Sequence, residues 1–260
     1  MTMSDISIHP IFNQAAPRIW DDFLRIRIAA MLVNYDVPMT AREIHDARAE
    51  YVRDWNRLSH NFAFAAYDDA YMIGYINGAI KSNVAEIFNL YVLPEYQGKL
   101  IGRRLLASAE RAVAPFANKI HLISWYGAQN FYKQQGCQPI GNTAEFTKKL
   151  LPAVCCTIPI FHLTPTMVQK CKNIAACAGV DFSADTINCE HKPMFMNINA
   201  DSNITGYGIY DYSTGEPYPT AVTPNSNPHS GEERRLMYAL DSFNIHKMQL
   251  NREKETLNGR

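Results

Sequence analysis

The stretch 84–106, VAEIFNLYVLPEYQGKLIGRRLL, constrains the fold more than any other part of the chain. Residues 85–92 are rich in apolar and aromatic side chains and are followed by Pro94, which cannot continue a hydrogen-bonded ladder, so they are predicted to form a buried strand. The second half predicts a helix whose apolar stripe consists of Ile101, Leu105, Ala109, Ala112 and Phe116.

The glycine-bearing turn between these two elements, residues 97–102, predicts an anion site. At the N-terminus of a helix the first backbone N–H groups have no partner within the helix, and the positive end of the helix dipole points the same way. Lys99, Arg103 and Arg104 add positive charge beside the turn.

A second motif follows downstream, AQNFYKQQGC at residues 128–137. Together with LYVLPEYQGKLIGRRLL, it resembles the acyl-CoA-binding core of the GCN5-related N-acetyltransferase (GNAT) superfamily. In that superfamily a Q-x-x-G-x-G/A turn cradles the pyrophosphate, and an A-x-x-F-Y-x-x-x-G-F motif follows in the same order. The resemblance covers about residues 6–150 and does not extend beyond Leu150.

The resemblance implies an α/β (α+β) fold with a mixed, mostly antiparallel acyl-CoA N-acyltransferase sheet flanked by helices. It also implies an acetyl-CoA-dependent N-acetyltransferase, with acetyl-CoA as co-substrate and a primary amine of a small molecule, peptide or protein as acceptor. The residues carried over as cofactor-binding are Leu90, Tyr91, Val92, Gln97, Gly98, Lys99, Leu100, Ile101, Gly102, Arg103 and Asn130.

Tyr132 occupies the position of the tyrosine that many family members use as general acid toward the departing thiolate. A phenol with a pKa of about 10 protonates a thiolate, whose conjugate acid has a pKa near 8.5, only with help from the site. The alternative is an aromatic side chain packed under the sheet edge with its hydroxyl satisfied. The catalytic interpretation is favoured, because Phe131 already supplies an apolar ring there.

Glu86 stands where histone-acetylating relatives carry a catalytic glutamate, within the same local pattern A-E-I. Deprotonating an amine with a pKa of about 10.4 at neutral pH costs roughly 4 to 5 kcal/mol, so a carboxylate acting as base is useful. The equal alternative is a strand glutamate that pairs with Lys81 or faces solvent.

Two positions depart from the family pattern. Leu100 replaces the glycine most common in the middle of the turn, and a leucine held at positive φ costs about 1 kcal/mol or more. Trp125 stands where relatives often have an asparagine that touches the cofactor arm, which Asn130 replaces only if its helix is rotated. These departures motivate an alternative function, a non-catalytic acyl-CoA-binding or protein-interaction module on the same fold.

Composition excludes several classes of protein. The formal net charge is 0, without the basic surplus typical of nucleic-acid or membrane-surface binding. No basic N-terminal region precedes an apolar run, and no apolar stretch approaches membrane-spanning length, so a cytoplasmic, soluble protein is expected. The six cysteines lack a C-x-x-C pair, which favours free buried thiols over a metal site.

Residues 40–58 are predicted to form a helix that begins with a capping box, Thr40 with Glu43 three residues later. Asp46, Glu50 and Asp54 recur along it at four-residue spacing. A solvated face partnered by arginines is favoured for this acidic stripe. The alternative is a surface that receives a cationic amine.

The sequence pattern restarts after Leu150, which predicts two domains, residues 1–150 and 151–260. The second is expected to be a small α+β domain, a strand, a helix to about Ala178, a hairpin, a loop over 213–230 and a helix over 231–243, with a polar tail. We expect it to pack as a second lobe that shapes the acceptor pocket or mediates self-association as a homodimer. The alternative is a tethered, independently folded module joined at Leu151-Pro152.

Overall fold

The computed structural model describes residues 6–12, 17–57, 61–151, 156–161, 163–178, 182, 194–199, 203–209, 221–222 and 239. The chain divides into two compact units, one of Met1–Ile11 with Ala15–Leu151 and the other of Phe12–Gln14 with Pro152–Arg260. Each unit is described by itself below.

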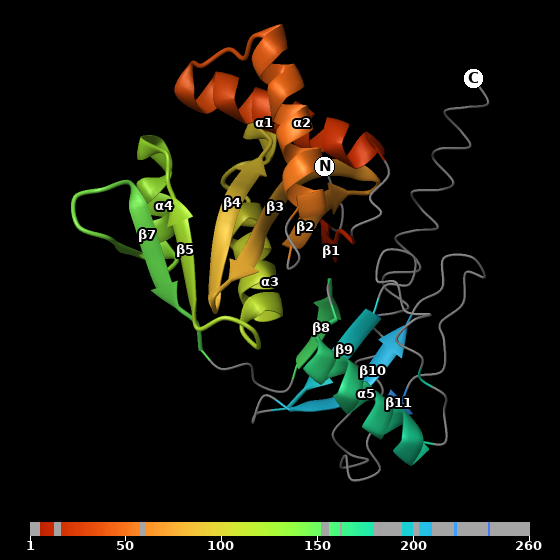
Figure 1. Cartoon of the computed structure of the whole chain (residues 1–260). Coiled ribbons are helices and arrows are strands. Elements are labelled where there is room, and N and C mark those ends of the chain that lie inside the picture. Colours follow the sequence, from red (N-terminus) through yellow and green to blue (C-terminus); the bar gives the residue numbers. More distant parts are fainter. Residues whose placement is uncertain are drawn as a thin grey trace, which may run out of the picture. The chain divides into compact units, whose positions relative to one another are not determined.

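The first unit is built on a seven-stranded sheet with the order β1-β2-β3-β4-β5-β7-β6 (Figure 1). Its strands are Ser7–Pro10 (β1), Asn61–Asp68 (β2), Tyr71–Lys81 (β3), Val84–Val92 (β4), Lys119–Ile123 (β5), Gln138–Pro139 (β6) and Glu145–Lys149 (β7). All neighbouring strands pair antiparallel except β4 and β5, which are parallel. The predicted fold class, a mixed and mostly antiparallel sheet with helices, is confirmed.

Helices cover both faces of this sheet. The helical elements are Pro17–Tyr35 (α1), Ala41–Arg57 (α2), Pro94–Tyr96 (η1), Ile101–Val113 (α3), Tyr126–Ala128 (η2) and Gln129–Gln134 (α4). Phe23 of α1 stacks on Tyr75 of β3 with ring centroids 3.9 Å apart, whereas Leu105 of α3 lies against the adjacent Gly74. Because successive strand residues point to opposite faces, α1 and α3 lie on opposite sides of the sheet.

The apolar stripe predicted for α3 is confirmed over most of its length. Ile101, Leu105, Ala109 and Ala112 are buried, and Leu106 and Val113 join them. Phe116 lies beyond the end of the helix at Val113 and is only partly buried.

The capping box predicted for α2 is confirmed. The Thr40 backbone N–H donates to Glu43 Oε2 over 2.7 Å, and the Glu43 N–H donates to Thr40 Oγ1 over 3.3 Å. This reciprocal pair satisfies two of the donors that a helix start leaves unpaired.

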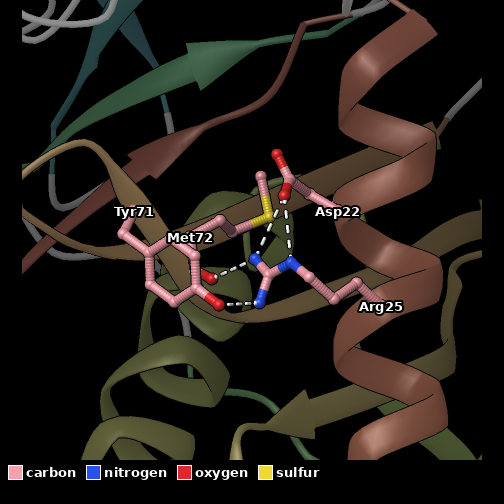
Figure 2. Close-up of polar contacts among 4 residues, drawn as sticks. All are labelled: Asp22, Arg25, Tyr71 and Met72. Carbon is pink, nitrogen blue, oxygen red and sulfur yellow. Dashed lines mark hydrogen bonds and ion pairs between the residues drawn. The ribbon is translucent and has the colours of Figure 1, made fainter. Parts of the chain in front are cut away.

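A cluster around Arg25 fastens α1 to the start of β3 (Figure 2). The guanidinium donates to the Tyr71 hydroxyl over 2.6 Å and to the Met72 carbonyl over 2.7 Å, and it forms an ion pair with Asp22 at 3.0 Å. It also lies over the Tyr71 ring at 4.3 Å. These contacts, made by one side chain, fix the position of α1 on the sheet.

His9 of β1 predicts an acid-dependent loss of stability. Burial lowers the pKa of His9 from 6.5 to about 4, so the unfolded chain takes up a proton that the folded chain does not. The free energy of unfolding is therefore expected to fall by about 2 to 3 kcal/mol between pH 6.5 and pH 4 through this group. Urea titrations of the parent and His9→Phe across this range measure the effect. His45→Gln, at an exposed helical position, is the control, and an unchanged pH dependence in His9→Phe would contradict the assignment.

The second unit contains a four-stranded antiparallel sheet of order β11-β10-β9-β8. Its elements are Cys156–Ile160 (β8), Pro165–Ala178 (α5), Met194–Ile198 (β9), Ile204–Ile209 (β10) and Ala221–Val222 (β11). Helix α5 contacts β10 and β11 (Figure 1). The predicted small α+β character and the hairpin of β9 and β10 are confirmed.

Three sequence predictions for the second unit have different outcomes. The loop predicted over 213–230 contains a short strand, β11, that extends the sheet. The terminal helix predicted over 231–243 lies, apart from Ala239, outside the described residues. Cys171 is a free buried thiol as expected, but Cys177 is exposed.

No helix in the described part of the chain has the length and apolar character needed to cross a bilayer.

Candidate active site

The site lies where β4 and β5 part. The two strands pair from Val84 with Lys119 to Ile87 with Leu122, and the pairing ends there, while β4 continues to Val92 beside β3. The second half of β4 therefore has its β5-facing edge open.

Backbone directions along this edge follow from the hydrogen bonds at its end. The Leu93 N–H donates to the Ile73 carbonyl of β3 over 2.9 Å, whereas the Val92 carbonyl accepts from Gln97 Nε2 over 3.0 Å. Because alternate residues of a strand point their backbone groups to opposite neighbours, the N–H groups of Leu90 and Val92 point to the open side. Leu90 and Val92, two of the predicted cofactor-binding residues, therefore present their backbone N–H groups to the open edge of β4.

A β-bulge at Phe88 shifts the alternation of side chains along β4 just after Glu86. Asn89 is opposite Asn77 and Ile87 is opposite Gly78, so Phe88 has no partner on β3. A Cβ added at Gly78 would lie 2.1 Å from the Glu86 carbonyl oxygen, so only glycine fits there. Because a bulge shifts the alternation by one residue, Asn89 and Tyr91 are placed on the same face as Glu86.

Two residues of the turn before α3 adopt left-handed backbone conformations. Gly98 has φ 75° and Leu100 has φ 62°, and the first helical hydrogen bond runs from the Arg104 N–H to the Leu100 carbonyl. The N–H groups of Ile101, Gly102 and Arg103 precede that bond, so they are the unpaired donors of the helix start. Leu100 thus has the positive φ at which a leucine is expected to be strained.

Leu100→Gly is expected to stabilise the protein by about 0.5 to 1 kcal/mol, because glycine adopts this conformation without strain. The Leu100 side chain is 65 % exposed, so little burial is lost. Thermal unfolding of the parent and the variant measures the gain. Leu100→Ala retains the strain and serves as control; an equal gain in both variants would show that backbone strain is not the cause.

The turn borders a cavity of about 680 Å³, here called the turn cavity. Nine of the eleven predicted cofactor-binding residues line it, namely Leu90, Tyr91, Val92, Gln97, Gly98, Leu100, Ile101, Gly102 and Arg103. The other two do not. The Lys99 ammonium instead lies 4.6 Å from the centre of the Tyr96 ring, and Asn130 is exposed on α4 outside the cavity.

Tyr132 of α4 also lines the turn cavity. Its ring is buried between Phe131 and Phe146, with centroids 5.0 and 6.2 Å away. No described residue shares a hydrogen bond with its hydroxyl, and that oxygen is not sealed from the cavity. Burial raises the pKa of Tyr132, so the hydroxyl stays protonated well above neutral pH. The structure thus combines features of both interpretations, a packed ring and an unpaired hydroxyl.

Glu86 faces a different cavity of about 490 Å³, here called the sheet cavity. The two predicted catalytic side chains therefore do not share one cavity. The cavities instead share one lining residue, Tyr91. On the sheet, Glu86 is opposite His121 of β5, whose Nε2 lies 3.4 Å from a Glu145 carboxylate oxygen.

The sheet cavity contains polar residues that sequence reasoning did not select as site residues. They are Arg27, Glu50, Asn61, Asn77, Asn89 and His121. Glu50 belongs to the acidic stripe of α2, for which the favoured prediction was a solvated face. Glu50 is exposed and the Arg42 Nε lies 3.8 Å from an Asp46 carboxylate oxygen, as a solvated face partnered by arginines predicts, although Glu50 also borders the cavity. Within the described ranges, no three His, Cys, Asp or Glu side chains lie close enough together to hold a metal ion.

The open strand edge, the turn and the cavities that share Tyr91 can be compared with known proteins. The model of the acetyltransferase (GNAT) family matches residues 21–137. This part of the chain is a GNAT acetyltransferase domain. The predicted family is confirmed, over a range within the 6–150 that the resemblance covered.

One sequence relative and two solved structures are similar to part of this chain. Over 62 residues, 24 % of this chain, the sequence is 42 % identical to spermidine N(1)-acetyltransferase of Thermoplasma acidophilum. The match spans 38 % of that relative's length. A solved PaiA N-acetyltransferase of Thermoplasma acidophilum in complex with coenzyme A covers 55 % of this chain and 99 % of its own, with 23 % identity and a TM-score of 0.45. An aminoglycoside 6′-N-acetyltransferase complexed with coenzyme A covers 56 % and 98 %, with 19 % identity and a TM-score of 0.44.

Proposed function

We propose that this protein transfers the acetyl group of acetyl-CoA to an amine. The observation that carries the proposal is that the turn cavity and the sheet cavity share the lining residue Tyr91. One cavity has an anion-binding helix start at its mouth, and the other is lined by carboxylates. Donor and acceptor would therefore meet beside the open edge of β4, and holding two reactants in contact supplies much of the catalysis in a bimolecular transfer.

The turn cavity would hold acetyl-CoA. The N–H groups at the start of α3 and the Arg103 guanidinium would bind the pyrophosphate. The N–H groups of Leu90 and Val92 would bind the pantetheine arm and polarise the thioester carbonyl, since preorganised donors stabilise a developing oxyanion. Lys99 and Asn130, outside this cavity, are left with no direct role in the proposal.

Tyr132 would protonate the departing thiolate, because Tyr132 lines the cavity that would hold the thioester. Glu86 would take the proton of the acceptor ammonium from the sheet cavity, directly or through water. Having the acid and the base in adjoining cavities is consistent with an acid that acts on the donor and a base that acts on the acceptor.

The second candidate is a non-catalytic acyl-CoA-binding or interaction module. The exposed Trp125 and the strained Leu100, both departures from the family pattern, favour it. Thiol release from acetyl-CoA over a panel of primary amines discriminates the two functions. Amine-dependent release that collapses in Tyr132→Phe supports the transferase, whereas binding of acetyl-CoA without release on every amine supports the module.

The role of residues 151–260 stays a prediction, with self-association or shaping of the acceptor pocket as the expected contribution. Expressing residues 1–150 alone tests it. We expect aggregation or lost turnover with acetyl-CoA binding retained. A soluble fragment with the melting temperature and activity of the full chain would refute the packed lobe.

A further inference from the structure

The sheet cavity holds a cationic group that amine transfer does not require. Arg27 is placed on α1 one turn after Phe23, whose ring stacks on Tyr75, so the guanidinium reaches the α1-facing side of the sheet. Its Nε atom is buried and has no hydrogen-bond partner in the described part of the chain. Because Nε is closed to water-sized groups, a ligand in the cavity would have to pair with the terminal nitrogens of the guanidinium.

The protein surroundings of Arg27 do not neutralise it. The guanidinium lies 5.9 Å from the centre of the Tyr51 ring, and no carboxylate among the described residues forms an ion pair with it. The Tyr51 hydroxyl lies within hydrogen-bonding reach of the guanidinium, and the Tyr75 and Tyr91 hydroxyls are nearby. Burial raises the pKa of all three, so the tyrosines stay neutral and Arg27 keeps its full charge.

The same cavity also carries negative charge, from Glu50 on α2 and Glu86 on β4. Groups of both signs therefore line one space of about 490 Å³. An acceptor with only positive charges, such as a polyamine, would pair with the carboxylates but would leave the Arg27 guanidinium without a counter-charge and bring like charges together.

We propose that the acceptor is a zwitterion, an amine that also bears a carboxylate, and that Arg27 binds this carboxylate. The inference rests on the proposed function, because it names the acceptor class of that site. Guanidinium and carboxylate form charge-assisted, geometrically matched hydrogen bonds, and the two terminal nitrogens of the guanidinium offer a two-donor edge. Tyr91, shared by both cavities, places this contact beside the expected position of the thioester.

Ligand binding tests the inference without relying on turnover. The probes are N-acetylated amino acids, each paired with its carboxamide, and N-acetylspermidine, titrated calorimetrically into the full chain saturated with CoA. The acids are expected to bind about 10- to 100-fold more tightly than their amides, the range that one charge-assisted pair provides. Amides that bind as well as acids, tighter binding of N-acetylspermidine, or no binding by any acid would overturn the proposal.

Variants at Arg27 test whether this residue causes the preference for acids over amides. Arg27→Met keeps side-chain length but removes the charge, and the acid-to-amide ratio is expected to fall to near one. Arg27→Lys keeps the charge but not the planar fork, so an intermediate ratio is expected. Arg18→Met, at an exposed position of the same helix, should keep the parental ratio. A full preference surviving in Arg27→Met would overturn the assignment.

Failure of the inference and failure of the proposed function give different results. If acids bind preferentially through Arg27 but no amine is acetylated, the acceptor site stands and the transferase function fails. If amines are acetylated but binding shows no preference for acids, the function stands and the inference fails. Melting temperatures of the variants show whether each is folded, and the acid-to-amide comparison in the parent protein decides the matter even where a variant is not.

Discussion

Tyr132→Phe is expected to lower kcat by about 100-fold or more, with the Kd for CoA nearly unchanged. The substitution removes only the hydroxyl, which shares no hydrogen bond with any described residue. The ring remains packed against Phe131 and Phe146, so little stability is at risk. A loss confined to kcat is the signature of an interaction made in the transition state.

Steady-state kinetics with saturating amine and a CoA binding titration measure the two quantities. Tyr126→Phe is the matched control, because Tyr126 is 90 % exposed and lines neither cavity. Equal kcat values for the parent and Tyr132→Phe would show that Tyr132 is only a packing residue.

The pH dependence of kcat provides a second readout for the same hydroxyl. Burial raises the pKa of Tyr132 above its ordinary value of 10. The protonated, donating form therefore persists to higher pH than for an exposed tyrosine. We expect no decline in kcat from this group below about pH 10, and a decline there that disappears in Tyr132→Phe would contradict the raised pKa of this hydroxyl.

Gly102→Asp is expected to weaken CoA binding by about 100-fold, because like charges placed together at a binding site cost several kcal/mol. The position lies in the first turn of α3 and lines the turn cavity. A carboxylate there would oppose the pyrophosphate directly. The same carboxylate favours the helix itself, since negative charge at a helix N-terminus is stabilising. Lost binding would thus not be a consequence of unfolding.

Gly102→Ala separates charge from bulk. A Cβ at position 102 lies 3.5 Å from Phe131 carbons and 3.9 Å from a Val92 methyl, which are ordinary contacts. We expect the alanine variant to keep most of the affinity in a calorimetric titration with CoA. An unchanged Kd for CoA in Gly102→Asp would show that this turn does not bind the pyrophosphate.

The turn region could be predicted because its signals are local. A strand closed by Pro94, a glycine turn and an apolar stripe on α3 are all written in consecutive residues. The same holds for the capping box of Thr40 and Glu43. Local hydrogen bonds and side-chain periodicity determine such elements, so a single sequence is enough to predict them.

The sheet cavity could not be predicted, because it depends on contacts between distant residues. Arg27 and Glu50 stand on surface-like helical positions, and only the packing of α1 and α2 on the sheet turns them toward Glu86. The bulge at Phe88, which aligns Asn89 and Tyr91 with Glu86, depends on the approach of Gly78 and leaves no clear signal in the sequence. The roles of Tyr132 and Glu86 stay predictions for the same reason, since they depend on bound substrates.

The most direct test of acetyl transfer follows the acetyl group itself. Acetyl-CoA carrying a deuterated acetyl group is incubated with the full chain and a panel of primary amines, and the amines are analysed by mass spectrometry while released CoA thiol is quantified. The account predicts that at least one amine gains the labelled acetyl group in a one-to-one ratio with released thiol, and that the Tyr132→Phe reaction is about 100-fold slower or more. Saturable binding of acetyl-CoA with no labelled amine above the enzyme-free background would contradict it.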